Sequence, residues 1–190
     1  MKKIEITPEL IEQTIRFHGH VCPGLAMGIR ASELALEIIG HDDDGGVVAI
    51  AEADMCAVDA IQYLTGCTLG KGNLIHVDYG KIAFSFFSRS NDKAFRIVLV
   101  PTVMDKIWTE MQEYPGSKKL FQEQFNYLMQ VEMGCLFKKT TVQRSVPRSA
   151  KPMKTHLCAN CREGVMESRV RLYDNKTFCI RCFNSVEQKN

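Results

Sequence analysis

Apolar residues recur with helical spacing in five stretches of the first 137 residues. Thr7 is expected to cap the first helix, with Pro8 at its first position, and Asp54 to cap the third. Gly40 and Gly66 are placed to end the second and third helices. The predicted helices are Pro8–Arg16, Pro23–Ile39, Met55–Leu64, Thr102–Glu113 and Lys118–Met133.

Shorter apolar runs between these helices predict strands. Val47–Glu52 and Phe95–Val100 are two of them, and Leu74–Tyr79 with Ile82–Ser88 is expected to form a hairpin that turns at residues 79–81. The strands follow one another, with helices before and after them. This order predicts an α+β fold, with helices packed on a mainly antiparallel sheet, rather than a doubly wound fold.

The second predicted helix is unusually rich in small residues, which allow another backbone to approach closely. These residues are Gly24, Ala26, Gly28, Ala31, Ser32 and Ala35.

Charge divides the chain into two parts. Residues 1–137 hold 12 Lys+Arg against 18 Asp+Glu, a balance of −6, whereas residues 138–190 hold 12 against 4, a balance of +8. Residues 138–154 contain six Lys+Arg, no acid and two prolines. We therefore expect a core domain over residues 1–137, a basic linker over 138–154 and a small domain over 155–190.

The small domain contains two Cys-x2-Cys pairs separated by 17 residues. This spacing is typical of a structural zinc site with four thiolate ligands. A pair of redox motifs or a disulfide knot is the alternative. We expect a hairpin turn at Asp174–Asn175 and a short helix over Ile180–Gln188. The four predicted zinc ligands are Cys158, Cys161, Cys179 and Cys182.

The chain has no apolar N-terminal leader and no segment near the roughly 18 apolar residues of a membrane span. A cytosolic location is therefore expected, with no membrane partner and with the eight cysteines as ligands or reactive thiols rather than disulfides. The basic tail raises nucleic acid as a partner. Four thiolates and one Zn²⁺ reduce its charge of +8 to about +6, however, so a protein partner, including a second copy, is at least as consistent.

The most reactive stretch is FHGHVCPG, residues 17–24. His18, His20 and Cys22 point one way if this segment is extended, because side chains alternate along extended backbone. Cys22 directly precedes Pro23, so its sulfur should lie at a helix N-terminus, where the pKa of a thiol is lowered.

Three further cysteines lie in the core domain. Cys56 and Cys67 flank the third helix, about 15 Å apart, so at most one of them should join the first cluster. Asp59 shares a helical face with Cys56. Cys135 is expected to be a small buried hydrophobe.

The loop GCTLGKG, residues 66–72, differs from a P-loop in length and lacks the hydroxyl residue after the lysine. Lys71 is nevertheless able to hold an anionic group of a substrate or cofactor.

The blocks FHGHVCPGLAMGIRA and CAVDAIQYLTGCTLGKGNL resemble the FmdE family, named for one of the subunits of formylmethanofuran dehydrogenase. The resemblance covers about residues 10–135, and the tail resembles the treble-clef zinc finger of some members. It implies a dimeric α+β core and a link to molybdenum or tungsten enzymes of one-carbon chemistry. It also implies a metal or active site built from His18, His20, Cys22, Cys56 and Cys67, with Asp59 and Lys71.

Three functions follow from these observations. The first is a metal-binding accessory protein or subunit, whose His/Cys core site holds zinc, iron, nickel or copper as a second transition metal. The second is a metal-free enzyme with Cys22 as nucleophile and His18 or His20 as its base. The third is a regulator that binds nucleic acid or protein through the zinc finger.

Overall fold

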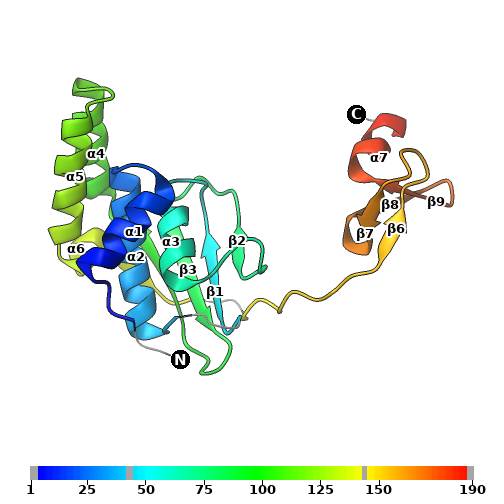
Figure 1. The fold of residues 1–190 in the computed structure, drawn as a ribbon, viewed down its shortest axis with the longest axis horizontal. Helices are drawn as coiled ribbons and strands as arrows, with labels where there is room; N and C mark the ends of the chain where they lie inside the picture. Colours follow the sequence, from blue (N-terminus) through cyan, green and yellow to red (C-terminus); the bar gives the residue numbers. More distant parts are fainter. Residues whose placement is uncertain (1–3, 42–44, 143–144, 188–190) are drawn as a thin grey trace. The chain divides into compact units, whose positions relative to one another are not determined.

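The computed structural model describes residues 4–41, 45–142 and 145–187 (Figure 1). The chain divides into two compact units, Met1–Ser149 and Ala150–Asn190.

Five main helices of the first unit lie close to their predicted positions. Thr7 caps the first by accepting a hydrogen bond from the Leu10 N–H, as expected. Asp54 is not a cap, because the third helix begins at Ala57 with Cys56 at the N-cap position. The helices are α1 (Pro8–His18), α2 (Pro23–Ile38), α3 (Ala57–Thr65), α4 (Pro101–Glu113), α5 (Lys118–Gln130) and the short α6 (Met133–Leu136).

Five strands form one sheet in the order β2-β1-β3-β4-β5, with only the β1–β2 pair parallel. The α+β class with a mainly antiparallel sheet is thus confirmed. The predicted hairpin is wrong, because β2 and β3 lie on opposite sides of β1, whose five residues are all buried. The strands are β1 (Val47–Ala51), β2 (Leu74–His76), β3 (Ala83–Ser88), β4 (Ala94–Leu99) and β5 (Phe137–Thr140).

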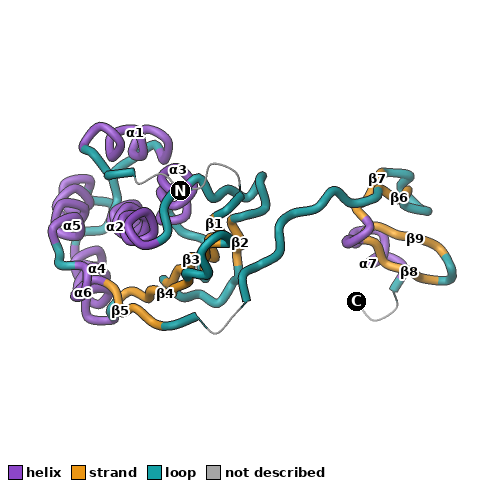
Figure 2. The backbone as a smooth tube through the Cα atoms, turned by 90° about the horizontal axis from the view of Figure 1, so that it is seen from below, coloured by secondary structure: helices purple, strands orange, loops and turns teal. Residues whose placement is uncertain are grey.

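The two faces of the sheet have different surroundings. One face packs against the helices and contributes Ala49, Phe86 and Phe95 to the main core; Figure 2 shows α1, α2 and α3 on this side of the strands. The other face carries Val48, Ile50 and Phe87, which form a second, smaller apolar cluster.

The beginning of the predicted linker belongs to the first unit. Residues 138–140 are part of β5, which pairs with β4, so the expected boundary at residue 138 differs from the structure. Val142 and Val146 pack on the sheet face away from the helices, and the Arg89 guanidinium donates to the Pro147 carbonyl at 3.1 Å. These contacts hold the segment after β5 against the first unit, because its apolar side chains cover strand residues that would otherwise face solvent.

The second unit consists of two hairpins and a short helix. Asp174 and Asn175 have φ values of 46° and 52°, so the predicted hairpin turn is confirmed. Gln188, the predicted end of the last helix, lies outside the described residues. The elements are β6 (Thr155–Leu157), β7 (Gly164–Met166), the 3₁₀ turn η1 (Glu167–Arg169), β8 (Val170–Tyr173), β9 (Lys176–Cys179) and α7 (Ile180–Val186).

Over the described ranges of the chain, every helix is too short or too polar to span a membrane.

Candidate metal centre

Four side chains from different elements meet in the first unit. His18 ends α1, His20 lies in the following loop, and Cys22 and Cys56 hold the N-cap positions of α2 and α3. One ligand atom from each lies within 4.8 Å of the others. Four of the five residues expected at the core site are therefore brought together.

The two histidines converge through a turn rather than through an extended segment. His18 is helical, and Gly19 then adopts a φ of 96°, which ends α1 and reverses the chain. The His20 ring consequently lies against the His18 ring, with centroids 4.3 Å apart. The expected proximity is present, but it results from this turn and not from the extended segment on which the sequence-based expectation depended.

Cys22 lies at the start of a helix, as predicted, and its Sγ accepts a hydrogen bond from the Leu25 N–H at 3.3 Å. Cys22 as a whole is only 6% exposed. Burial raises the pKa of Cys22 to about 11, and the Leu25 N–H only partly opposes this effect. The predicted lowering of the Cys22 pKa is therefore wrong for the metal-free protein.

Close packing of α2 and α3 brings Cys56 to this place. A Cβ atom at Gly28 would lie 2.3 Å from the carbonyl oxygen of Ala57, and one at Gly24 would lie 3.1 Å from the Cβ of Cys56. Only glycine at position 28 allows the two backbones to approach this closely. The small residues predicted to permit close packing thus position a ligand of the candidate site.

Asp59 orients the first histidine. Its Oδ2 accepts a hydrogen bond from His18 Nδ1 at 2.8 Å, and His18 Nε2 lies 3.8 Å from Cys22 Sγ. A carboxylate on one ring nitrogen leaves the other nitrogen free to bind a metal. Nitrogen and sulfur ligands of tetrahedral zinc lie about 3.6 Å apart, so this pair fits such an ion.

The other candidates lie elsewhere. Cys67 follows the far end of α3 and is fully buried in the main core. Lys71 is exposed in the same loop. Cys135 lies in α6 and is exposed, so its predicted burial is wrong.

The second cysteine group has the predicted composition. The sulfurs of Cys158, Cys161, Cys179 and Cys182 lie within 4.8 Å of one another. The Cys179 N–H donates to Cys158 Sγ at 3.3 Å and is the main reason that the pKa of Cys158 is lowered to about 6. Four sulfurs at this separation, one of them on a thiol with a lowered pKa, are suited to binding a structural zinc ion.

Aromatic residues surround this second group. Phe178 is buried against Cys158 and Cys182, with Phe183 packed beside them. The Tyr173 ring meets both phenylalanine rings edge-on. These side chains form the expected small core around the cysteines.

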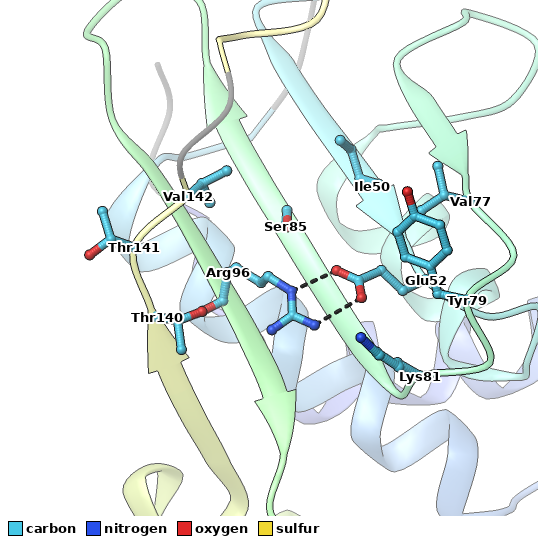
Figure 3. A pocket seen from close by; sticks show the side chains of 10 residues that line it. All are labelled: Ile50, Glu52, Val77, Tyr79, Lys81, Ser85, Arg96, Thr140, Thr141 and Val142. Carbon is cyan, nitrogen blue, oxygen red and sulfur yellow. Dashed lines mark hydrogen bonds and ion pairs between the residues drawn. The ribbon is translucent and has the colours of Figure 1, made fainter.

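Sequence reasoning overlooked a polar pair on the opposite face of the sheet. Glu52 and Arg96 form a bidentate ion pair within a cavity (Figure 3). The sequence indicated this pair only by one charged residue in each of two otherwise apolar stretches, Glu52 in VVAIAE and Arg96 in AFRIVLV.

Two family models match the chain. Residues 17–138 match "FmdE, Molybdenum formylmethanofuran dehydrogenase operon", and residues 154–188 match "Prokaryotic dksA/traR C4-type zinc finger". The first match contains the converging histidines and cysteines, and the second contains the cysteine group of the tail.

Two known proteins are similar over most of the chain. A "probable S-adenosyl-L-methionine-binding protein" of Archaeoglobus fulgidus is 29% identical over 197 residues, covering 93% of this chain. The chain spans about half, 53%, of that relative's length. The crystal structure of a "tungsten formylmethanofuran dehydrogenase subunit e (fmde)-like protein" from Syntrophus aciditrophicus matches with a TM-score of 0.68 and 24% identity, covering 98% of each chain. The latter likeness supports the fold.

Proposed function

This chain belongs to the FmdE family, and from that premise we propose that its core is a metal-binding domain serving a redox enzyme of the molybdenum or tungsten formylmethanofuran dehydrogenase type. One observation carries the proposal: the convergence of His18, His20, Cys22 and Cys56 within 4.8 Å. The family name and that of the Syntrophus protein support the choice of partner enzyme.

The donor set fits a borderline transition metal. Two imidazoles and two thiols suit zinc, iron, nickel or copper, whereas magnesium and calcium prefer oxygen ligands. Cys22 is buried, while His20 is exposed. We propose His18, Cys22 and Cys56 as the permanent ligands, with His20 on the side where a substrate or partner gains access.

The metal-free alternative receives less support. A nucleophilic Cys22 with His18 or His20 as base needs a thiolate near neutral pH. A pKa of about 11 leaves this thiol protonated there. A bound metal removes the difficulty, because a coordinating thiol loses its proton.

The C-terminal finger is proposed to have a structural and docking role. Four thiolate ligands close the coordination sphere of zinc and leave no position for catalysis. Leu157, Met166 and Leu172 are 67%, 61% and 75% exposed, which favours a protein partner over nucleic acid. Binding of finger-containing protein to duplex DNA or RNA, with a steep salt dependence, would contradict this choice.

Two further expectations accompany the proposal. A homodimer is expected from the family resemblance, and a monomeric mass in light scattering would contradict it. A cytosolic location is expected because the chain carries two groups of metal-ligating cysteines, whose thiols have to stay reduced.

Metal analysis of the full-length protein tests the core site. Cys22→Ser and Cys56→Ser should each bind one metal ion fewer than the unaltered chain. Cys67→Ala and Cys135→Ser serve as matched controls and should keep the full metal content. Full metal content in Cys22→Ser would exclude this site.

The partner enzyme needs a separate test. The tagged chain is isolated from its native host, and molybdenum and tungsten are measured in the eluate. The eluate is expected to be enriched in one of the two elements. This enrichment should disappear when an excess of untagged chain competes for the partner. Absence of both from an eluate that contains the intact chain would remove the proposed association.

A further inference from the structure

A cavity of about 490 Å³ lies on the sheet face away from the helices (Figure 3). Its size is within the range of small-molecule sites. Strand register explains its floor, because Ile50, Ser85, Arg96 and Thr140 are aligned across β1, β3, β4 and β5. None of these residues belongs to the candidate metal centre.

The small side chain of Ser85 leaves room above the middle of the sheet. The Arg96 side chain extends over β3 through this space, and its Nε and Nη2 donate to the Glu52 carboxylate at 2.6 and 2.8 Å. Glu52 is only 7% exposed. The base of the cavity therefore contains an ion pair whose carboxylate is nearly buried, while the Arg96 side chain is 24% exposed.

The loop before β3 forms one wall. The N–H groups of Tyr79 and Lys81 both donate to the Glu52 carbonyl, at 3.1 and 3.2 Å, and hold the loop against the end of β1. Their side chains line the cavity on this side. The opposite wall is formed by Thr141 and Val142, which follow directly from β5.

The charge of the lining favours an anion. Arg96 and Lys81 contribute two positive charges against the single negative charge of Glu52. Among described residues, Arg96 Nη1 has no protein acceptor, since the contacts of Arg96 to Glu52 use the other two nitrogens. The hydroxyls of Ser85 and Thr141 can each donate a further hydrogen bond to an anion.

A structural role alone explains this arrangement poorly. Buried ion pairs contribute little to stability compared with apolar residues of similar volume. Here the pair lines an open cavity together with a second cation, next to apolar side chains of Ile50, Val77 and Val142. A ligand with a negatively charged head and an apolar body matches both features.

We propose that this cavity binds a small organic oxyanion, a carboxylate or phosphate ester, with its charged head at Arg96 and Lys81 and its apolar body against Ile50, Val77 and Val142. The site is independent of the metal centre, because it uses the other face of the sheet and different residues.

NMR titration of the full-length, metal-loaded protein tests the proposal. Phenyl phosphate and benzoate represent the two oxyanions, and benzyl alcohol and benzylamine are the neutral and cationic controls. The oxyanions should shift the Arg96 Nε–H signal and the amide signals of Lys81 and Ser85. Tighter binding of phenyl phosphate indicates a phosphate ester, and tighter binding of benzoate a carboxylate; either supports the site.

A charge reversal provides the matched comparison. Lys81→Glu should weaken oxyanion binding at least about tenfold, since it places a negative charge beside the head group. Lys118→Glu, at an exposed position at the start of α5, should leave oxyanion binding unchanged. The proposal is overturned if neither oxyanion binds, if either control binds equally well, or if Lys81→Glu has no effect.

Discussion

Asp59 Oδ2 lies 2.8 Å from Nδ1 of His18, although the two residues are 41 positions apart. This hydrogen bond joins the first turn of α3 to the last residue of α1. It fixes the ring so that Nε2 faces Cys22. The contact therefore links α1 and α3, two of the three helices whose ends supply ligands to the candidate metal centre.

Loss of this contact should weaken the core site. Asp59→Ala is expected to lower the affinity of the core for its metal by about 10–100-fold, as for other carboxylates behind a metal-bound histidine. Competition with a chromogenic chelator measures the change. Asp54→Ala is the control, because Asp54 is exposed nearby. Equal affinities of the two variants would show that Asp59 does not support the metal.

Gly28→Ala should disrupt the packing that delivers Cys56. The added methyl would lie 2.3 Å from the Ala57 carbonyl oxygen, so α2 and α3 must separate. A loss of about 1–3 kcal/mol in the free energy of unfolding is expected, with weaker core metal binding. Chemical denaturation and metal titration measure these effects. Gly134→Ala, where a methyl meets nothing within 4 Å, should leave both nearly unchanged.

The raised pKa of Cys22 predicts slow alkylation of the metal-free protein. Between about pH 7 and 9 the thiol should remain protonated and react slowly with iodoacetamide, and the rate should rise toward pH 11. Because burial favours the neutral thiol, its contribution to stability is complete below pH 9 and is lost as the pH rises through about 11. Mass spectrometry of the labelled peptide measures the rate. Rapid modification of Cys22 at pH 7 would instead support the metal-free nucleophile.

Removal of zinc should unfold the C-terminal finger without unfolding the core. The finger has only a small apolar cluster, so metal binding supplies most of its folding free energy. Cys161→Ser should abolish the amide signal dispersion of residues 155–187 and leave the core signals in place. Cys135→Ser, which lies outside both cysteine groups, is the control. A folded finger in Cys161→Ser would show that apolar packing is sufficient.

Acid should release zinc from the finger. The Cys179 N–H holds the pKa of Cys158 at about 6, below its ordinary value of 9.0, so this thiolate is available at neutral pH. Its contribution to stability is present above pH 9 and is lost as the pH falls through about 6. Zinc release followed with a colorimetric reagent should therefore increase below pH 6. Release already complete at pH 7 would contradict the lowered pKa.

Local patterns in the sequence determined several features. The helices, the Thr7 cap, the turn at Asp174–Asn175 and the position of Cys22 at a helix start all depend on residues close in sequence. The four-cysteine finger was predictable for the same reason, because paired ligands at short spacing define it.

Contacts distant in sequence decided the rest. The choice of Cys56 over Cys67 depends on the close contact between Gly28 and Ala57. The pairing of β2 with β1 rather than with β3 could not be read from the short connection between β2 and β3. The sequence by itself thus determined which elements form and which side chains are reactive. Only the tertiary structure decided which of them meet, because backbone approach and strand pairing are settled by packing between separate elements.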